Sequence, residues 1–187
     1  MSKWPRYPTI YEVDTWVWLS DLSKKSGTSI DLSCVLSAEW DSMVAYGFDA
    51  VWLMGVWERS PSGVAIANRN QALLDDFRRA LPDFQLQDNV GSPCCVRRYV
   101  VDKHLGGPDG LAAARKELAK RGMNLILDFV PNHVAPDHPW VREHPEYFVQ
   151  GVPTTSEATQ HLSLMWKGVS VHAGGIHISP RGQMFWN

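Results

Sequence analysis

Residues 124–140 read NLILDFVPNHVAPDHPW and decide how the chain is interpreted. The apolar run at the start predicts a buried β-strand that carries Asp128 close to its end. Pro131 blocks further ladder pairing, so Asn132 and His133 follow on a polar loop. An Asn carbonyl oxygen suits calcium, and an imidazole can donate a hydrogen bond to a sugar hydroxyl. The segment predicts a site for a hard cation or a polyol, whereas Asp128 taken alone could also cap a turn.

The elements around this strand alternate between strands and helices. Polar residues follow Met54 and Leu127, at the carboxyl ends of two predicted strands. This alternation is typical of parallel α/β architecture with right-handed crossovers, in which ligands bind beyond the strand ends. In chain order, the pattern predicts a strand at Thr9–Leu19, a helix at Val35–Tyr46, a strand at Ala50–Met54, a helix at Asn68–Leu81, a helix from Pro108 to Gly122 and a strand at Asn124–Phe129.

Charge and composition exclude several classes of protein. Lys and Arg total 18 against 20 Asp and Glu, and no dense basic run offers a footprint for nucleic acid. Residues 1–10 lack the apolar core of a signal peptide, and no later run is long enough to cross a bilayer, so we expect a cytoplasmic protein without a membrane partner. The odd set Cys34, Cys94 and Cys95 favours reduced thiols over a disulfide framework.

Nine tryptophans are several times the average usage of roughly 1–2%. Indole rings are large apolar faces with a hydrogen-bonding edge, and sugar rings stack on such faces. The alternative interpretation is that Trp16, Trp18, Trp40 and Trp52 are core or half-buried residues of strands and helices. Tryptophan content therefore does not decide the function.

The segment from Asp128 to His133 resembles the first conserved region of the α-amylase family of glycoside hydrolases (family 13), which reads Asp-x-x-x-Asn-His at the end of the third barrel strand. The similarity extends from about Pro8 to about Gly151, with the family's motifs in the right order. Those motifs are TIYEVDTWVWL, GFDAVWLMGVWERSP, GSPCCVRRYVVDKHLGGPDGL and RGMNLILDFVPNHVAPDHPW.

The resemblance implies an α/β fold, with residues 1–150 as the N-terminal portion of the catalytic (β/α)8 TIM barrel. About the first three strands would be present, with the start of the loop domain inserted after strand 3. It also implies that Asn132 is a calcium ligand, that His133 contacts the sugar at the cleavage subsite, and that Asp128 supports this substrate site. Without the resemblance, Asp128 and His133 would be a satisfied strand-end carboxylate and a loop histidine. His138 and His144 could form a zinc site with His133, but the prolines between them favour loop histidines.

Retaining α-glucan chemistry needs a nucleophile and a general acid/base roughly 5–5.5 Å apart. The family places them after the fourth and fifth strands, with a stabilising Asp after the seventh. Glu58, Asp102, Asp109 and Glu143 do not match those positions, so none is assigned a catalytic role. Relatives commonly carry a sugar-stacking Tyr where this chain has Cys94, and a thiol is no such platform. Cys94 and Cys95 are then either two inert small residues or a redox pair.

Residues 151–187 lack regular patterning and are interpreted as an irregular tail. One permitted codon choice for residues 175–187, read one nucleotide earlier, gives DPHFTPWTDVLE, which is similar to the family's DPYFPAWTDVLQ-type segment. The hypothesis is a frameshift, and sequencing the gene for an overlapping frame that encodes the missing strands tests it.

A barrel with three strands leaves open edges, so we expect a marginal, oligomeric or aggregation-prone chain.

These observations lead to one preferred function and two alternatives. The preferred function lies in carbohydrate metabolism. The chain would be a truncated retaining hydrolase or transglycosylase that acts on α-glucans or α-glucosides, and we expect it to be inactive alone. Calcium is the expected cofactor. The alternatives are a non-catalytic carbohydrate-binding fragment and a half-barrel that needs a separately encoded partner. Hydrolysis, glucosyl transfer and isomerisation are not separable from this sequence, because loops beyond the third strand choose the acceptor.

Overall fold

The computed structural model describes residues 4–148 and five short strand segments beyond them, 150–151, 163–166, 169–172, 177–178 and 184–185. The chain divides into two compact units. The sheet unit comprises Met1–Arg59, Ser92–Cys94 and Arg98–Phe129, and the loop unit comprises Ser60–Gly91, Cys95–Arg97 and Val130–Asn187. Within the described residues, no helix is both long enough and apolar enough to span a bilayer.

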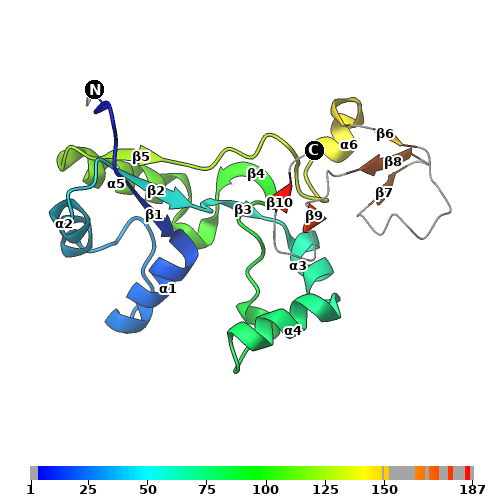
Figure 1. Cartoon of the computed structure of the whole chain (residues 1–187), viewed down its shortest axis with the longest axis horizontal. Coiled ribbons are helices and arrows are strands. Elements are labelled where there is room, and N and C mark those ends of the chain that lie inside the picture. The colour runs from blue at the N-terminus through cyan, green and yellow to red at the C-terminus, as the bar shows by residue number, and fades with distance from the viewer. Residues whose placement is uncertain are drawn as a thin grey trace. The chain divides into compact units, whose positions relative to one another are not determined.

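The sheet unit is built on three parallel strands in the order β1-β2-β5 (Figure 1). They are β1 (Ile10–Asp14), β2 (Ala50–Met54) and β5 (Asn124–Ile126). Ala50 of β2 lies opposite Ile10 of β1 and Asn124 of β5, so the carboxyl ends of all three strands lie at one edge. This confirms the predicted strand Ala50–Met54 and the α/β class.

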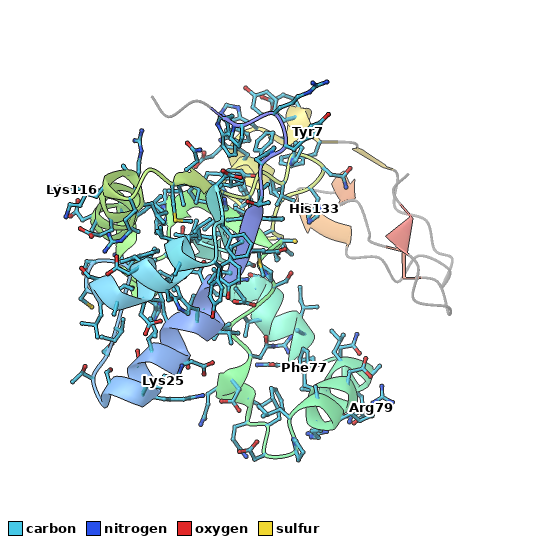
Figure 2. The ribbon with its side chains drawn as sticks, turned by 60° about the vertical axis from the view of Figure 1, so that its left-hand side comes forward. Tyr7, Lys25, Phe77, Arg79, Lys116 and His133 are labelled. Atoms are coloured by element: carbon cyan, nitrogen blue, oxygen red, sulfur yellow. The ribbon has the colours of Figure 1, made fainter. Side chains whose placement is uncertain are left out.

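Three helices accompany the sheet in this unit, α1 (Thr15–Ser26), α2 (Ser37–Ala45) and α5 (Gly107–Lys120) (Figure 1). Figure 2 labels Lys25 on α1 and Lys116 on α5. Apolar side chains at helical spacing give each helix one face to bury, which is the main source of helix stability in a folded protein. The core residues are Val13, Leu19, Leu22, Leu32, Trp40, Met43, Val51, Leu53, Val56, Val101, Leu105, Ala114, Leu118 and Met123.

The predicted strand Thr9–Leu19 is wrong in its second half, because the chain turns into α1 at Thr15. Asp14 ends the strand and caps the helix, its carboxylate accepting the Val17 N–H at 3.3 Å. Thr15, Leu19 and Leu22 are buried at helical spacing. The β-branched and aromatic residues here favour a strand locally, but capping and burial of this face outweigh that preference.

A two-stranded ribbon of β3 (Trp57–Arg59) and β4 (Val96–Val101) was not predicted from the sequence. Thirty-six residues, 60–95, separate its two strands, so no local sequence pattern predicts their pairing. The 3-10 helix η2 (Lys103–Leu105) follows β4 and leads into α5. The ribbon begins at Trp57, three residues after the carboxyl end of β2 at Met54.

The loop unit contains the predicted helix Asn68–Leu81, which the structure places at α4 (Gln71–Ala80), with Phe77 and Arg79 labelled in Figure 2. The Asn70 side chain caps this helix by accepting the N–H groups of Ala72 and Leu73. The other elements are α3 (Pro61–Ala67), η1 (Leu86–Asp88), α6 (Trp140–Glu143), η3 (Pro145–Tyr147), β6 (Gln150–Gly151), β7 (Ser163–Trp166), β8 (Val169–His172), β9 (His177–Ile178) and β10 (Met184–Phe185).

The predicted boundary near residue 150 and the proposed frameshift concern the last part of the chain. Residues 152–162, 167–168, 173–176, 179–183 and 186–187 lie outside the described residues. Between them, the strands β6, β8 and β7 form an antiparallel sheet in that order, and β9 pairs with β10. The boundary and the frameshift therefore stay predictions.

Candidate functional site

Asp128 is fixed at the carboxyl edge of the sheet by three donors from β2 and the residues after it. Trp52 Nε1 donates to one carboxylate oxygen at 2.7 Å, and the Gly55 N–H donates to the other. Trp57 Nε1 donates to the Asp128 carbonyl at 2.9 Å. The Asp128 side chain is half-buried. A carboxylate bound at both oxygens is held in one orientation, so Asp128 acts as an organising anchor of this edge.

Strand β5 is shorter than predicted, ending at Ile126 instead of Phe129. Ladder pairing with β2 stops where Trp52 lies opposite Ile126. Beyond that point the indole of Trp57 satisfies the main-chain carbonyl of Asp128. A side-chain donor thus replaces a ladder partner, which sequence periodicity does not reveal.

A buried cation, Arg59, lies at the same edge. Only 8% of the residue is exposed, and its Nη2 donates to the Gly55 carbonyl at 3.2 Å. The guanidinium carbon lies 5.5 Å from the centroid of the Trp16 ring, a cation–π distance. Burial lowers the pKa of Arg59, and three nearby carboxylates, together with the Cys94 thiol, oppose that shift. In order of their effect, those carboxylates belong to Asp14, Asp102 and Asp128.

Gly55 joins the anchor and the cation, because its N–H contacts Asp128 and its carbonyl contacts Arg59. Its φ of +77° lies in the left-handed region, which a residue with a Cβ rarely adopts. A Cβ here would also lie 2.7 Å from Arg59 Nη2 and 2.9 Å from Pro93 Cβ. Glycine is therefore required by both conformation and space.

Asp102 and His104 form a second pair in the sheet unit. The Asp102 carboxylate caps η2 by accepting the His104 N–H at 2.9 Å, and it lies 2.9 Å from His104 Nδ1. Its other oxygen accepts the Arg59 main-chain N–H at 3.4 Å. Asp102 is buried, whereas the His104 side chain is 81% exposed and lies 5.7 Å from Trp16, measured between ring centroids. Asp102 is thus engaged in shaping the loop that precedes α5.

The other two predicted site residues, Asn132 and His133, belong to the loop unit, so they and Asp128 are described in separate units. Asn132 is exposed on a bend, and His133 is half-buried beside it (Figure 2). Calcium takes six to eight oxygen ligands. In the part of the chain that the structure describes, no three His, Cys, Asp or Glu side chains gather as metal ligands. Calcium binding at Asn132 therefore stays a prediction.

The Asp137 carboxylate holds the loop after His133 in place. It accepts the Ser60 hydroxyl at 2.6 Å and the Ser62 N–H at 3.3 Å, and Arg97 Nε lies 3.7 Å away. The main chain adds a bond from the Ala135 N–H to the Val96 carbonyl at 3.0 Å. The loop is thus held by charge-assisted bonds inside its own unit.

His138 was interpreted as a loop histidine, and the structure shows that it is buried, with 7% exposure. Its Nδ1 accepts the Trp140 N–H at 3.1 Å, which requires an unprotonated Nδ1. Burial lowers the pKa of His138, opposed by the charges of Asp137 and Glu143. His138 therefore belongs to the fold of this loop.

The structure also shows the surroundings of the three cysteines and of Glu58. No disulfide joins Cys34, Cys94 or Cys95. Glu58 forms a two-point ion pair with Arg98, one of whose contacts measures 3.0 Å. Sequence reasoning missed Trp52, Gly55 and Arg59 as partners of the strand end. A glycine directly after the apolar run 50–54 was the available signal of a special backbone position.

Comparison with known proteins identifies the fold. No family model matches the chain. The chain is 33% identical over 112 residues to the α-1,4-glucan:maltose-1-phosphate maltosyltransferase of Rhodospirillum rubrum, a match covering 56% of this chain and 14% of that protein. It superposes on an α-amylase from Lactobacillus plantarum with a TM-score of 0.55 at 20% identity, covering 88% of this chain and 31% of the other. The chain shares its fold with the matching part of this α-amylase.

A further solved structure, described as a family GH13_31 enzyme, matches the α-amylase-type fold with a TM-score of 0.55 at 18% identity, over 88% of this chain and 28% of the other. The chain thus spans about one seventh of the curated relative and under a third of the solved structures it matches. These likenesses show the fold.

Proposed function

We propose that this α-amylase-type chain supplies the N-terminal rim of a site that binds α-glucans or α-glucosides for retaining hydrolysis or transglycosylation. The observation that carries the proposal is the fixed Asp128 carboxylate at the carboxyl edge of a parallel sheet of this family. In barrels of this kind the active site is built from loops at that edge.

Within this proposal His133 donates a hydrogen bond to a hydroxyl of the sugar at the cleavage subsite. Asp128 keeps the strand end in place, because its oxygens already accept from Trp52 and Gly55. Asn132 supplies one carbonyl ligand to calcium, an ion that would stabilise the loop by cross-linking it to other oxygen donors. These three roles are the family's, carried onto matching positions.

The activities named for two relatives support an α-glucan as the class of substrate. One is an α-1,4-glucan-using maltosyltransferase, and another is an α-amylase. We propose that the nucleophile and the general acid/base come from outside this chain, so that the chain alone binds glucan without cleaving it. Two of its acidic side chains already have structural tasks, Asp102 as a cap and Glu58 as the partner of Arg98.

Calorimetric titration of the whole chain with maltoheptaose tests the proposal, together with an assay for released reducing sugar. His133→Ala should weaken binding about tenfold or more, since hydrogen bonds to a bound ligand in a desolvated site are costly to remove. His144→Ala is the matched control, a histidine of the same unit that pairs with Glu146 at 3.0 Å. Absence of any glucan binding would refute the sugar site, and hydrolysis by the chain alone would refute the external catalytic pair.

The half-barrel alternative is favoured by one observation. Among the described strands, β1 and β5 each pair with β2 alone, so both present an unpaired edge. A second polypeptide carrying further strands could pair there. Appearance of glucan-cleaving activity only on mixing the chain with such a polypeptide would establish this alternative.

A further inference from the structure

The imidazole of His138 is packed into the turn that leads to α6, inside the loop unit. Only 7% of the residue is exposed, and its ring lies 5.2 Å from the Trp140 ring between centroids, at an interplanar angle of 70°. The His138 N–H donates to the Ala135 carbonyl at 2.9 Å, and its own carbonyl accepts the Val141 N–H at 3.0 Å. Ala135 and Val141 are themselves buried. The main chain of His138 therefore joins the loop before the turn to the helix after it.

One hydrogen bond fixes where this ring carries its proton. Nδ1 of His138 accepts the Trp140 N–H at 3.1 Å, and a main-chain N–H can only donate. Nδ1 therefore presents a lone pair, and the proton of the neutral ring is on Nε2. A second proton has to bind Nδ1, the atom that the Trp140 N–H already contacts. Protonation thus turns the acceptor into a second donor, and the first N–H of α6 loses its partner.

The charges around the ring do not offset its burial. Asp137 beside the ring and Glu143 at the end of α6 favour the protonated form, but burial has the larger effect and lowers the pKa of His138. Asp137 also has other partners, because its carboxylate accepts the Ser60 hydroxyl at 2.6 Å and lies 3.7 Å from Arg97 Nε of β4. A charged ring at this position therefore loses both its solvation and its hydrogen bond, and it recovers its solvation by leaving the site.

The remaining titratable and charged side chains of this segment are placed apart from that bond. His144 Nδ1 lies 3.0 Å from a Glu146 carboxylate oxygen, and the His144 ring stacks on Tyr147 at 4.8 Å between centroids. Tyr147 in turn lies 5.7 Å from the Trp140 ring. Arg142 of α6 is exposed. His144 is thus the second histidine of the segment and the natural comparison for His138.

We propose that His138 is a pH-sensitive switch: when Nδ1 takes up a proton, the ring leaves the Trp140 N–H and the turn into α6 opens locally. Helix α6 has only four residues, so few main-chain hydrogen bonds hold it without this contact. The loop before the turn keeps the bond from the Ala135 N–H to the Val96 carbonyl at 3.0 Å, which does not involve the imidazole. The opening is therefore confined to the segment that begins at His138. Neither sugar nor calcium takes part, so the switch does not rest on the proposed function.

Hydrogen exchange of the whole chain at pH 7.5 and pH 5.5, followed by mass spectrometry, tests the switch after correction for the intrinsic exchange rate at each pH. An opened ring has the ordinary pKa of 6.5, one unit above the lower pH, which favours opening up to about tenfold. Peptides that cover residues 138–147 should therefore lose about three- to tenfold in protection at pH 5.5. Peptides that cover α5 should keep their protection.

Two variants assign the response to one residue. His138→Gln keeps an acceptor for the Trp140 N–H but does not titrate, so the protection of residues 138–147 should be the same at both pH values. His144→Gln is the matched control and should keep the loss seen in the original chain. Unchanged protection in the original chain, or an equal loss in His138→Gln, would overturn the switch. A similar loss in α5 would mean global unfolding and would overturn it as well.

A second measurement uses the original chain and does not depend on how a variant folds. Nitrogen-15 chemical shifts of labelled histidine should place the His138 proton on Nε2 at pH 7.5. As the pH falls, the His138 signals and the Trp140 amide signal should change with the same midpoint. A proton on Nδ1 at pH 7.5, or a Trp140 amide that stays unchanged while His138 titrates, would contradict the proposal.

Discussion

The indole N–H of Trp52 donates to the Asp128 carboxylate at 2.7 Å, joining β2 to the segment after β5 across 76 positions of sequence. A hydrogen bond from a neutral donor to a half-buried carboxylate is charge-assisted, and it is stronger than a hydrogen bond between two neutral groups. It fixes the anchor residue of the candidate site without any contribution from the ladder.

Trp52→Phe should therefore destabilise the fold by about 1.5–3 kcal/mol, because one oxygen of a half-buried carboxylate loses its donor. Urea unfolding of Trp52→Phe, Asp128→Asn and the double variant isolates the pair in a double-mutant cycle. We expect a coupling of about 1–3 kcal/mol. Additive effects of the two substitutions, within about 0.5 kcal/mol, would contradict the role given to this bond.

Gly55→Ala should be markedly worse than Gly47→Ala. Both glycines have positive φ, +77° and +80°, so both substitutions carry a similar conformational cost of about 1 kcal/mol. Only at Gly55 would the new methyl group meet other atoms, whereas nothing lies within 4 Å at Gly47. Thermal or urea unfolding should show an additional loss of about 1–3 kcal/mol at Gly55. Equal losses would mean that the contact with Arg59 and Pro93 relaxes without cost.

Arg59→Met should cost about 3–5 kcal/mol at pH 7, since it leaves three neighbouring carboxylates without their buried cation. Arg98→Met is the matched control on the same ribbon, an exposed pair with Glu58 expected to cost about 1 kcal/mol or less. An Arg59→Met loss in urea unfolding that is no larger than the Arg98→Met loss would contradict the role given to this buried cation.

His138 should make stability depend on pH near neutrality. Because burial holds the pKa of folded His138 below its ordinary value of 6.5, protons bind the unfolded chain more readily. Its contribution is complete above pH 6.5 and is lost as the pH falls from 6.5 toward the lowered pKa. Urea midpoints at pH 7.5 and 5.5 for the original chain and His138→Gln should show a smaller acid loss in the variant. The same loss in both would exclude His138 as the cause.

The open edges of β1 and β5 lead us to expect self-association, because each strand presents unpaired main-chain groups. Sedimentation velocity over a hundredfold range of concentration should show a rising mean mass. Glu12→Pro, on the free side of the edge strand β1, should reduce that rise by removing a main-chain donor. A monomer with a cooperative, concentration-independent melt would count against this expectation.

Much of the fold is local enough to be predicted. The strand at residues 50–54 follows from a continuous apolar run, and helix α4 follows from its Asn cap and apolar stripe. The family resemblance likewise rests on contiguous motifs. The end of β1 was misplaced because residues 15–19 favour a strand by composition, while Asp14 and a buried face impose a helix.

The sequence by itself determined the parallel α/β class, the resemblance to the α-amylase family and the choice of Asp128, Asn132 and His133 as candidate site residues. The tertiary structure alone decided what surrounds Asp128. Its donors and the buried cation Arg59 come from a segment far from it in the chain. Sequence periodicity and helix caps can be recognised within a dozen residues. Hydrogen bonds and ring contacts between distant segments form only when the chain folds.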